Sequence, residues 1–232
     1  MIRLSPGLAL VLLGCAPAAV PPPPDAGCTA GVRRFVGDVV NARDLGGIPS
    51  ASGVVACGAL FRGAVPSSPG ACDSFAVAGV RTIIDLREAS ERQGVPDAAC
   101  LPGAMVLAPM PIPFNVSAAD YLADLDAPPV RAVFAALGDE TAYPVFFHCT
   151  YGRDRSGVIA ALTLLTLGAS REEILRDYQR TAAEGLSTTP ASLEAVLDEV
   201  ERRGGAEAHL RSIGVTGPEL ATLRARQLPP QP

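Results

Sequence analysis

The sequence predicts an α/β protein with a mostly parallel central sheet flanked by helices. One observation behind this is that short apolar, β-branched runs alternate along the chain with segments that carry helix-capping residues. A second is the passage over residues 144–167, where an apolar run leads through a short glycine-containing loop directly into a helix-like run. In sheets of this class ligands bind at the carboxyl ends of the strands, so this loop marks the expected site.

The individual elements follow from local composition. The predicted strands are the runs richest in apolar and β-branched residues, at residues 54–61, 81–86, 105–113 and 145–148, the third of them broken by prolines. The predicted helices are bounded by capping residues, prolines or glycines, at residues 73–78, 117–125, 129–138, 156–168, 174–181, 190–203 and 216–227. Ser170 with Glu173, and Thr216 with Glu219, form two capping boxes.

Length, charge and composition narrow the function classes. A chain of 232 residues suits one well-packed domain with appendages. The net charge of -5, with no basic stretch beyond two adjacent arginines, argues against a nucleic-acid partner. The two histidines, His148 and His209, make a zinc or iron centre improbable, and no Walker-type loop implies a nucleotide. We therefore expect neither a metal nor a cofactor.

The N-terminus has the layout of a secretory signal. Arg3 supplies a positive charge, and residues 8–13 form an apolar run too short to span a membrane. The following Leu-Leu-Gly-Cys, which ends at Cys15, resembles a bacterial lipobox, in which the cysteine is acylated and becomes the mature N-terminus. We predict a lipoprotein signal peptide at residues 1–14; the alternative is ordinary cleavage after Ala18 or Ala19.

A tether is predicted to follow the signal peptide. Residues 15–33 are rich in proline and alanine, including four consecutive prolines at 21–24, and such a composition favours an extended spacer over a packed core. The folded domain is expected at residues 34–232. Together these segments predict an extracytoplasmic protein, in the periplasm or at the cell surface, held to the membrane by an N-terminal lipid.

The predicted export favours disulfide bonds among the remaining cysteines. With Cys15 assigned to lipid and one cysteine to the loop at residue 149, an even number remains in an oxidising compartment. The disulfide candidates are Cys28, Cys57, Cys72 and Cys100. Of the three possible pairings we favour Cys57 with Cys72 and Cys28 with Cys100, because the first closes a short loop. The alternative is that the four are free, buried thiols.

The loop after residue 148 combines a thiol with an anion-binding frame. Cys149 is followed by five residues and then Arg155, at the expected start of a helix. Backbone N–H groups and the helix dipole converge there and favour a bound dianion. The same field favours the thiolate form of Cys149, which is the nucleophile, and Arg155 can hold two phosphate oxygens as a bidentate fork. These residues suit attack by sulfur on a phosphate ester.

The loop resembles the His-Cys-x-x-Gly-x-x-Arg-Ser/Thr signature of cysteine-dependent protein tyrosine and dual-specificity phosphatases. Residues 152–157, Gly-Arg-Asp-Arg-Ser-Gly, are similar to the Gly-Lys-Asp-Arg-Thr-Gly variant of secreted bacterial tyrosine and lipid phosphatases. Residues 41–47, Asn-Ala-Arg-Asp-Leu-Gly-Gly, resemble the Asn-Phe-Arg-Asp-Leu-Gly-Gly motif of that subfamily. Residues 60–63 and 79–87 resemble its Phe-Arg-Ser and Asp-Leu-Arg elements. The resemblance implies a phosphotyrosine phosphatase-like fold for residues 34–232.

The resemblance also implies residue roles. Cys149 would form a cysteinyl-phosphate, and Ser156 would donate to the sulfur. The oxygens of the phosphoryl group would be held by the N–H groups of the loop and by arginine side chains, from Thr150, Tyr151, Gly152, Arg153 and Arg155. His148 is expected to orient the loop.

The general acid is left with several candidates. The resemblance implies Asp154, which lies inside the signature. The alternatives are other aspartates near predicted strand ends or in a possible lid, namely Asp85, Asp44, Asp120 and Asp124. For Asp44 and Asp85 we favour a structural role as ion-pair partners of Arg43, Arg62 or Arg87.

The leading hypothesis is a phosphoric monoester hydrolase acting on phosphotyrosine, with phosphoserine, phosphothreonine or phosphoinositides left open as further substrates. Arg153 adds a second cation, which either selects doubly phosphorylated substrates or is solvated. Two alternatives remain: a rhodanese-like sulfurtransferase, and a non-catalytic surface lipoprotein that binds phosphorylated ligands. The histidine before Cys149 and the Ser-Gly pair after Arg155 favour the phosphatase over the sulfurtransferase. The sequence does not determine the oligomeric state.

Overall fold

The computed structural model describes residues 39–111, 117–123 and 125–228. The predicted signal peptide and tether, with Cys15 and Cys28, lie outside the described residues, as does Asp124. Within the described ranges, no helix combines the length and the apolar character that crossing a membrane requires.

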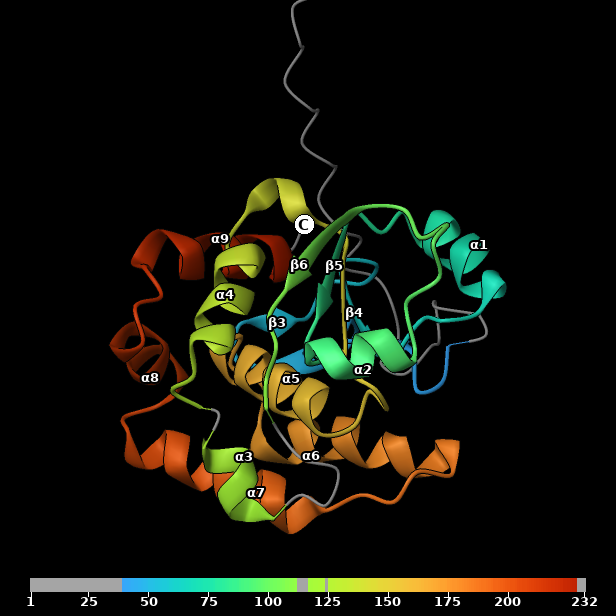
Figure 1. Cartoon of the computed structure of the whole chain (residues 1–232). Coiled ribbons are helices and arrows are strands. Elements are labelled where there is room, and N and C mark those ends of the chain that lie inside the picture. The colour runs from blue at the N-terminus through green and yellow to red at the C-terminus, as the bar shows by residue number, and fades with distance from the viewer. Residues whose placement is uncertain (1–38, 112–116, 124, 229–232) are drawn as a thin grey trace, which may run out of the picture.

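A central sheet organises the described part of the chain (Figure 1). Its five strands lie in the order β1 (Arg43–Asp44), β4 (Leu60–Gly63), β7 (Val145–His148), β5 (Thr82–Asp85) and β6 (Ala104–Leu107). The pairs β4–β7, β7–β5 and β5–β6 are parallel, and only β1 runs antiparallel to its neighbour β4. A separate two-stranded ribbon joins β2 (Pro49–Ser50) to β3 (Gly53–Val54). The predicted mostly parallel sheet is confirmed.

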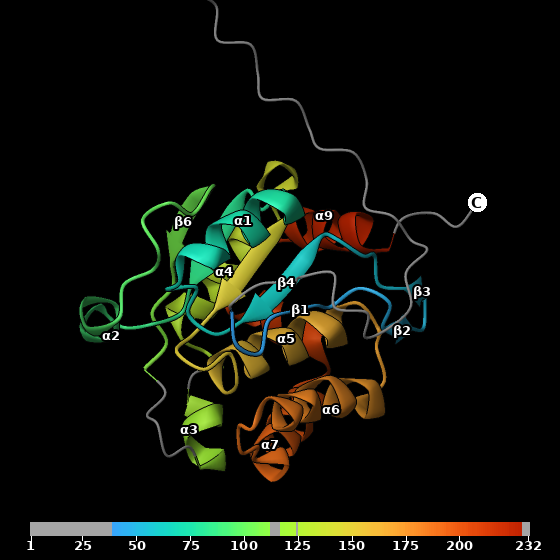
Figure 2. The ribbon, with the colours of Figure 1, turned by 90° about the vertical axis from the view of Figure 1, so that its right-hand side faces the viewer.

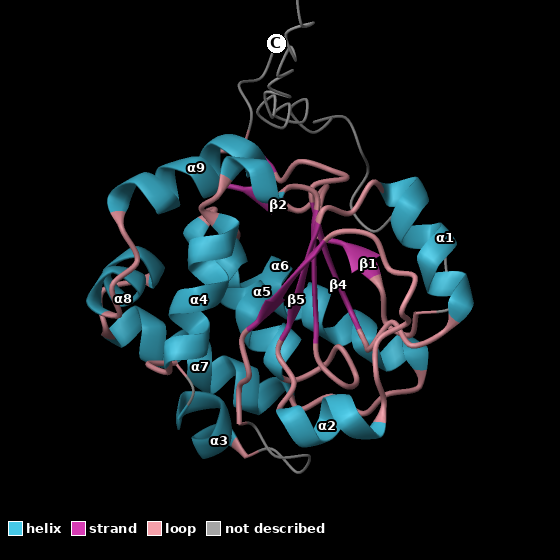
Figure 3. Cartoon of the chain, turned by 45° about the horizontal axis from the view of Figure 1, so that its top comes forward, coloured by secondary structure: helices cyan, strands magenta, loops and turns pink. Residues whose placement is uncertain are grey.

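Helices cover the sheet unequally. The helix α1 (Pro69–Ala78) packs on one face, and α5 (Arg155–Thr166), α6 (Arg171–Gln179) and α7 (Pro190–Arg202) lie on the other (Figure 2). On that second side the described chain adds α4 (Pro128–Leu137), α8 (Ala206–Ser212) and α9 (Gly217–Gln227) (Figure 3). The short helices α2 (Ala89–Gly94) and α3 (Ala118–Ala123) lie towards the end of the sheet where the parallel strands finish.

Alternation along the strands builds two cores. On β7, Val145 and Phe147 belong to the larger core under α4 and α5, whereas Phe146 belongs to the smaller core under α1. Neighbouring residues of β5 alternate in the same way, with Ile84 in the larger core and Ile83 in the smaller one. Strands buried on both faces read as continuous apolar runs, which is why residues 145–148 and 81–86 could be predicted.

Some elements differ from expectation. The predicted strand at residues 54–61 is divided, because the chain turns at Gly58 and Ala59 between β3 and β4. The helix predicted at 73–78 begins at Pro69 and ends, as expected, at Gly79, whose left-handed φ of 67° closes it. The short helices α2 and α8 were not predicted; α2 has no buried residues, so it lacks an apolar periodicity.

The expected disulfide pairing is wrong. Cys72, in α1, is bonded to Cys100, in the segment before β6, with a Cα–Cα distance of 5.8 Å. That segment passes beside the start of α1, where the N–H of Ala98 donates to the carbonyl of Pro66. Cys57 is also disulfide-bonded, but strand β4 separates it from α1, so the short sequence separation from Cys72 was misleading. The pairing of Cys28 with Cys100 is excluded by the same bond.

Candidate active site

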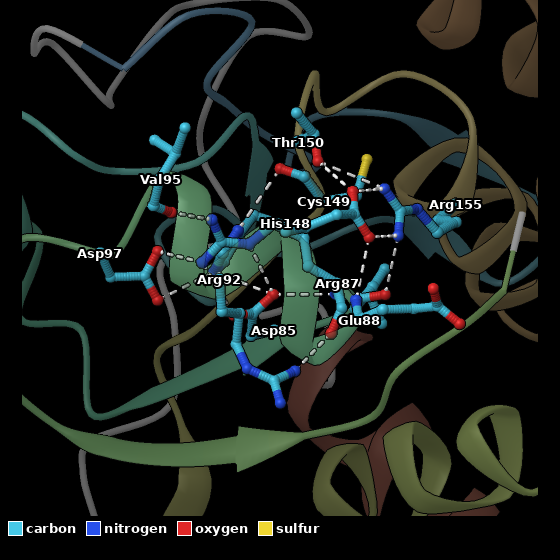
Figure 4. Close-up of polar contacts among 12 residues, drawn as sticks. Asp85, Arg87, Glu88, Arg92, Val95, Asp97, His148, Cys149, Thr150 and Arg155 are labelled. Atoms are coloured by element: carbon cyan, nitrogen blue, oxygen red, sulfur yellow. Dashed lines mark hydrogen bonds and ion pairs between the residues drawn. The ribbon is translucent and has the colours of Figure 1, made fainter. Parts of the chain in front are cut away.

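The catalytic loop lies where the sheet ends. β7 finishes at His148, level with Gly63 of β4 and Asp85 of β5 in the parallel registers, and α5 begins at Arg155. Cys149, the first loop residue, is buried and is a free thiol. Thr150, Cys149 and Arg155 lie together at this edge (Figure 4). The structure therefore gathers the predicted nucleophile and phosphate-binding arginine at one place.

Gly152 is a steric requirement of the loop. Its φ is 66°, a left-handed conformation that costs other residues energy. A Cβ at this position would lie 2.3 Å from the carbonyl carbon of Gly63, so the loop rests directly on the backbone of β4. Position 152 therefore accepts only glycine without a shift of the loop.

Asn41 of the N-terminal motif and Arg62 of β4 hold the loop carbonyls. Asn41 Nδ2 donates to the carbonyl oxygens of Gly152 at 2.9 Å and of Tyr151 at 3.3 Å. From β4, Arg62 Nη2 donates to the same Gly152 oxygen at 2.9 Å and to Arg153 at 3.3 Å. In a trans peptide the C=O and N–H groups point in opposite directions. Because Asn41 and Arg62 bind the carbonyls, the N–H groups of the same peptides point the other way, as an anion-binding loop requires.

A buried carboxylate pairs with Arg62 and with Arg43 of the N-terminal motif. Asp177, on α6, accepts from Arg43 Nε at 2.7 Å and from Arg62 Nη1 at 2.8 Å. Although burial favours the neutral acid, the charges of the two arginines lower the pKa of Asp177 to about 2. Burial, together with the charge of Arg43, lowers the pKa of Arg62 to about 10. The loop is thus supported by an ion cluster that draws on residues from both ends of the domain.

Arg155 is paired with a glutamate that sequence reasoning missed. Its Nη1 and Nη2 atoms lie 2.6 Å from Glu91 Oε2 and Oε1, and Thr150 Oγ1 also donates to Glu91. Although burial opposes ionisation, the hydrogen bonds from Arg155 and Thr150 lower the pKa of Glu91 to about 2. Glu91 lies on α2, whose lack of an apolar pattern hid it. Arg155 Nη1 also approaches the carbonyls of Leu86 and Met110, each at 3.3 Å.

Asp154 lies at the N-cap of α5, and its side chain does not cap the helix. Its Oδ1 accepts from the hydroxyl of Tyr121 at 2.6 Å, and both of its oxygens lie 2.9 Å from Arg153 Nε. Arg153 Nη1 donates to the carbonyl and hydroxyl oxygens of Ser187. The second cation of the loop therefore holds Asp154 and the segment before α7, and is not simply solvated.

The remaining acid candidates have structural tasks. Asp85 is paired with Arg87 at 2.9 Å, as expected. Asp44 accepts from the backbone N–H groups of Gly46 and Gly58, and Asp120 accepts from Ser117 at the start of α3. Hydrogen bonds from the Ser117 backbone and side chain lower the pKa of Asp120. Of the described candidates, Asp154 is the aspartate that belongs to the catalytic loop.

His148 lies behind the loop beside two carboxylates (Figure 4). Its Nε2 is 3.6 Å from Asp97 Oδ2 and 3.9 Å from Asp85 Oδ1, and its Nδ1 is 3.4 Å from the carbonyl of Cys149. Asp85, Asp97 and His148 are a donor set that can suit a metal ion. Here the guanidinium of Arg87 bonds to both carboxylates and supplies the positive charge between them.

Ser156 and Tyr151 complete the predicted set. Ser156 Oγ, one residue after Arg155, is buried and has no hydrogen-bond partner among the described residues, so its hydroxyl is available to a neighbouring sulfur or ligand. Tyr151 is exposed, with 44% of its surface accessible. The site thus combines a buried thiol, a guanidinium held in one orientation, and a loop whose carbonyls are bound by Asn41 and Arg62. These features define a class of protein: an α/β enzyme that attacks phosphate esters through cysteine.

Comparison with known proteins gives the family. Residues 36–229 match the model of the tyrosine phosphatase family. A protein of Cupriavidus necator named as a tyrosine-protein phosphatase is 31% identical over 243 residues, which covers 86% of either chain. A tyrosine-protein phosphatase of Nostoc commune is 29% identical over 201 residues, covering 66% of this chain and 68% of the relative. The chain belongs to the tyrosine phosphatase family, and the predicted enzyme class is confirmed.

Among solved structures, that of P. aeruginosa TpbA in complex with pTyr is similar. Its sequence identity to this chain is 22%, and the alignment covers 71% of this chain and 86% of TpbA with a TM-score of 0.37.

Proposed function

We propose that this chain hydrolyses phosphotyrosine through a cysteinyl-phosphate, and that it is a membrane-anchored member of the secreted bacterial subfamily. The observation that carries the proposal is the meeting of a buried free thiol, Cys149, with the first residue of α5, Arg155, at the carboxyl end of β7. A helix N-terminus and a guanidinium both stabilise the charge of a phosphoryl group and of a thiolate.

The first step is phosphoryl transfer to sulfur. The Cys149 thiolate attacks phosphorus, the S–P bond forms, and the bond from phosphorus to the leaving oxygen breaks. Asp154, as the acid, gives its proton to that oxygen. The loop N–H groups and Arg155 hold the three equatorial oxygens, where charge must be stabilised.

The second step returns the enzyme to its starting state. Water attacks phosphorus, Asp154 takes the proton from that water, and the S–P bond breaks to release inorganic phosphate. Ser156, the residue after Arg155, has a buried hydroxyl that can donate to the departing sulfur. This role explains a buried hydroxyl that has no partner among the described residues.

The test is hydrolysis by the full chain, in reductant, of phosphotyrosine, phosphoserine and phosphothreonine peptides and phosphoinositides in parallel. Each reaction is run beside Cys149→Ser, which keeps the anion site but replaces the thiolate. We expect turnover of phosphotyrosine that depends on Cys149, and retained phosphate binding by the variant. Binding without turnover in the parent would instead support a non-catalytic module, and sulfur transfer from thiosulfate to cyanide would support the sulfurtransferase.

The role of Asp154 has its own test. Asp154→Asn cannot protonate a leaving oxygen, so aryl phosphates with poor leaving groups should lose roughly 100-fold in kcat/KM, and nitrophenyl phosphate far less. An equal loss on both substrates would assign Asp154 a structural role only.

The proposed location rests on the lipobox-like segment that ends at Cys15 and on the proline-rich residues that follow. We expect the wild-type chain, expressed in a bacterial host, to fractionate with membranes and to incorporate labelled palmitate. Cys15→Ala should abolish both properties, and Cys28→Ala, which leaves the lipobox intact, should preserve them. Membrane association that persists in Cys15→Ala would refute the lipid anchor.

A further inference from the structure

A tyrosine from α3 contacts the carboxylate assigned as the acid. Tyr121 is fully buried, and its hydroxyl donates to Asp154 Oδ1 at 2.6 Å. The same hydroxyl lies 3.0 Å from the hydroxyl of Tyr178 and 3.4 Å from Thr189 Oγ1. Segments on either side of the catalytic loop in sequence therefore converge on Asp154, which is 7% exposed.

We propose that Tyr121 is a positioning residue that fixes the carboxylate of Asp154 and reserves its Oδ2 atom for the catalytic proton. This inference rests on the proposed function, because it assigns Tyr121 a task in the acid step of that reaction.

The argument begins with the two oxygens of Asp154. Oδ1 accepts from Tyr121 and from Arg153 Nε, whereas Oδ2, among the described residues, contacts the shared Arg153 Nε alone. A carboxylic acid carries its proton on the oxygen that accepts fewer hydrogen bonds, because each donor opposes protonation of the oxygen that it contacts. The donor from Tyr121 therefore directs the proton to Oδ2.

Tyr121 remains a donor throughout the working range of pH. Burial, together with the charge of Asp154, raises the pKa of Tyr121 far above its ordinary value. A phenol that stays protonated donates to a carboxylate more strongly than to a carboxylic acid, so it tightens its hold when Asp154 has given up its proton. The aspartate is then in position to take a proton from water in the second step.

Other charged and titratable groups also face Asp154. They are Arg153 on the loop, Arg155 on α5, Tyr121 on α3 and Tyr178 on α6, with the neutral hydroxyl of Thr189 beside them. Tyr178 bonds to Tyr121 and Thr189, and so supports the donor without touching the carboxylate in the described contacts. Substitution at position 121 therefore removes one donor from Asp154 and leaves both arginines in place.

The experiment is the pH dependence of kcat/KM for Tyr121→Phe on aryl phosphates of graded leaving-group pKa. The parameter kcat/KM reports the first step, in which Asp154 must be protonated. Loss of a donor disfavours the charged carboxylate relative to the acid, so the alkaline limb of kcat/KM should move to higher pH by about one unit. Poor leaving groups should lose roughly 10-fold in kcat/KM, and nitrophenyl phosphate little, because the acid is less well placed.

Two comparisons separate this role from a general loss of packing. Tyr143→Phe removes another buried hydroxyl, which donates to the carbonyl of Leu137 at 2.6 Å, and should leave the pH limb unchanged. In an Asp154→Asn background, Tyr121→Phe should cause no further loss in kcat/KM, because both changes act on one group. Additive losses, or an unmoved alkaline limb in Tyr121→Phe, would overturn the proposal.

A second probe works even if Tyr121→Phe folds poorly. Fluorotyrosine placed at position 121 keeps the shape and the hydroxyl but is a stronger donor, so the alkaline limb should move to lower pH, opposite to the effect of phenylalanine. A shift in the same direction as for phenylalanine, or none, would overturn the proposal. Absence of Cys149-dependent turnover in the parent would overturn both this inference and the proposed function, whereas turnover with unmoved limbs would overturn this inference alone.

Discussion

Glu91 holds both terminal nitrogens of Arg155 at 2.6 Å, from a helix that contributes nothing to the hydrophobic core. The pair fixes the plane of the guanidinium before any ligand is bound. A fork held in one orientation loses less entropy when it binds a phosphoryl group than a fork that must be ordered at that moment.

Glu91→Gln should lower kcat/KM for phosphotyrosine peptide by roughly 10- to 100-fold. The amide offers one acceptor where the carboxylate offers two charged ones, so Arg155 is held less firmly in its productive position. Steady-state kinetics test this result. Glu88→Gln, at the N-cap of the same helix, provides the control, because Glu88 has no described contact with Arg155 and its amide can still cap. Equal kinetics for Glu91→Gln and the parent would contradict the role.

Gly152→Ala should abolish most activity. A Cβ there meets the backbone of Gly63 at 2.3 Å, so the loop must shift away from β4. Gly185→Ala is a matched control, since Gly185 has a similar φ of 75° but nothing within 4 Å of its Cβ position. Both variants should lose about 1 kcal/mol of unfolding free energy to backbone strain, and only Gly152→Ala should also lose phosphate binding. Intact binding in Gly152→Ala would show that the loop tolerates the displacement.

Asp177→Asn should reduce the free energy of unfolding by about 3–5 kcal/mol, because it leaves two buried arginines without a counter-charge. Urea denaturation near neutral pH measures this loss. Asp198→Asn breaks an exposed pair with Arg171 and should change stability little. Equal losses in the two variants would show that the buried cluster contributes no more to the free energy of unfolding than the exposed pair does.

The lowered pKa values of Asp177 and Glu91 predict how the free energy of unfolding responds to acid. The pKa of Asp177 falls from 3.8 in its unperturbed state to about 2 in the folded chain, and that of Glu91 falls from 4.5 to about 2. A lowered folded-state pKa contributes stability that is complete above the unperturbed value and lost as pH falls towards the folded value. The unfolding free energy of the parent should therefore fall steeply between these limits, and that of Asp177→Asn less steeply. Parallel acid profiles of the two proteins would contradict the assignment.

Joint replacement of Cys72 and Cys100 by alanine should lower the unfolding free energy by about 3.5 kcal/mol. The bond closes a loop with a sequence separation of 28, and chain entropy gives that value for a loop of this length. Activity should persist, because neither cysteine belongs to the catalytic loop. Denaturation in the absence of reductant measures the change. Stability equal to that of the parent would mean that the bond adds no constraint to the unfolded chain.

The sequence allowed prediction of those features that depend on neighbours along the chain. The strand, loop and helix around Cys149 are contiguous, so their order and the position of Arg155 could be inferred from local patterns. The partners of that loop could not be inferred, because Glu91, Asp177 and Tyr121 reach it only through the tertiary fold. Cysteine pairing failed for the same reason, since proximity in sequence gave no information about which strand would separate Cys57 from Cys72.

The grip of Asn41 and Arg62 on the loop carbonyls also bears on the biogenesis of the enzyme. The loop needs supports made early in synthesis, while the carboxylate that balances those supports, Asp177, is made after the loop itself. A nascent or truncated chain can contain the whole signature and still lack Asn41 and Arg62 on one side of it or Asp177 on the other. In such a chain the loop is not held in its anion-binding conformation. Catalytic competence is therefore expected to emerge only when nearly the full domain has been assembled, which would keep an unfinished chain from acting on phosphate esters where it is made.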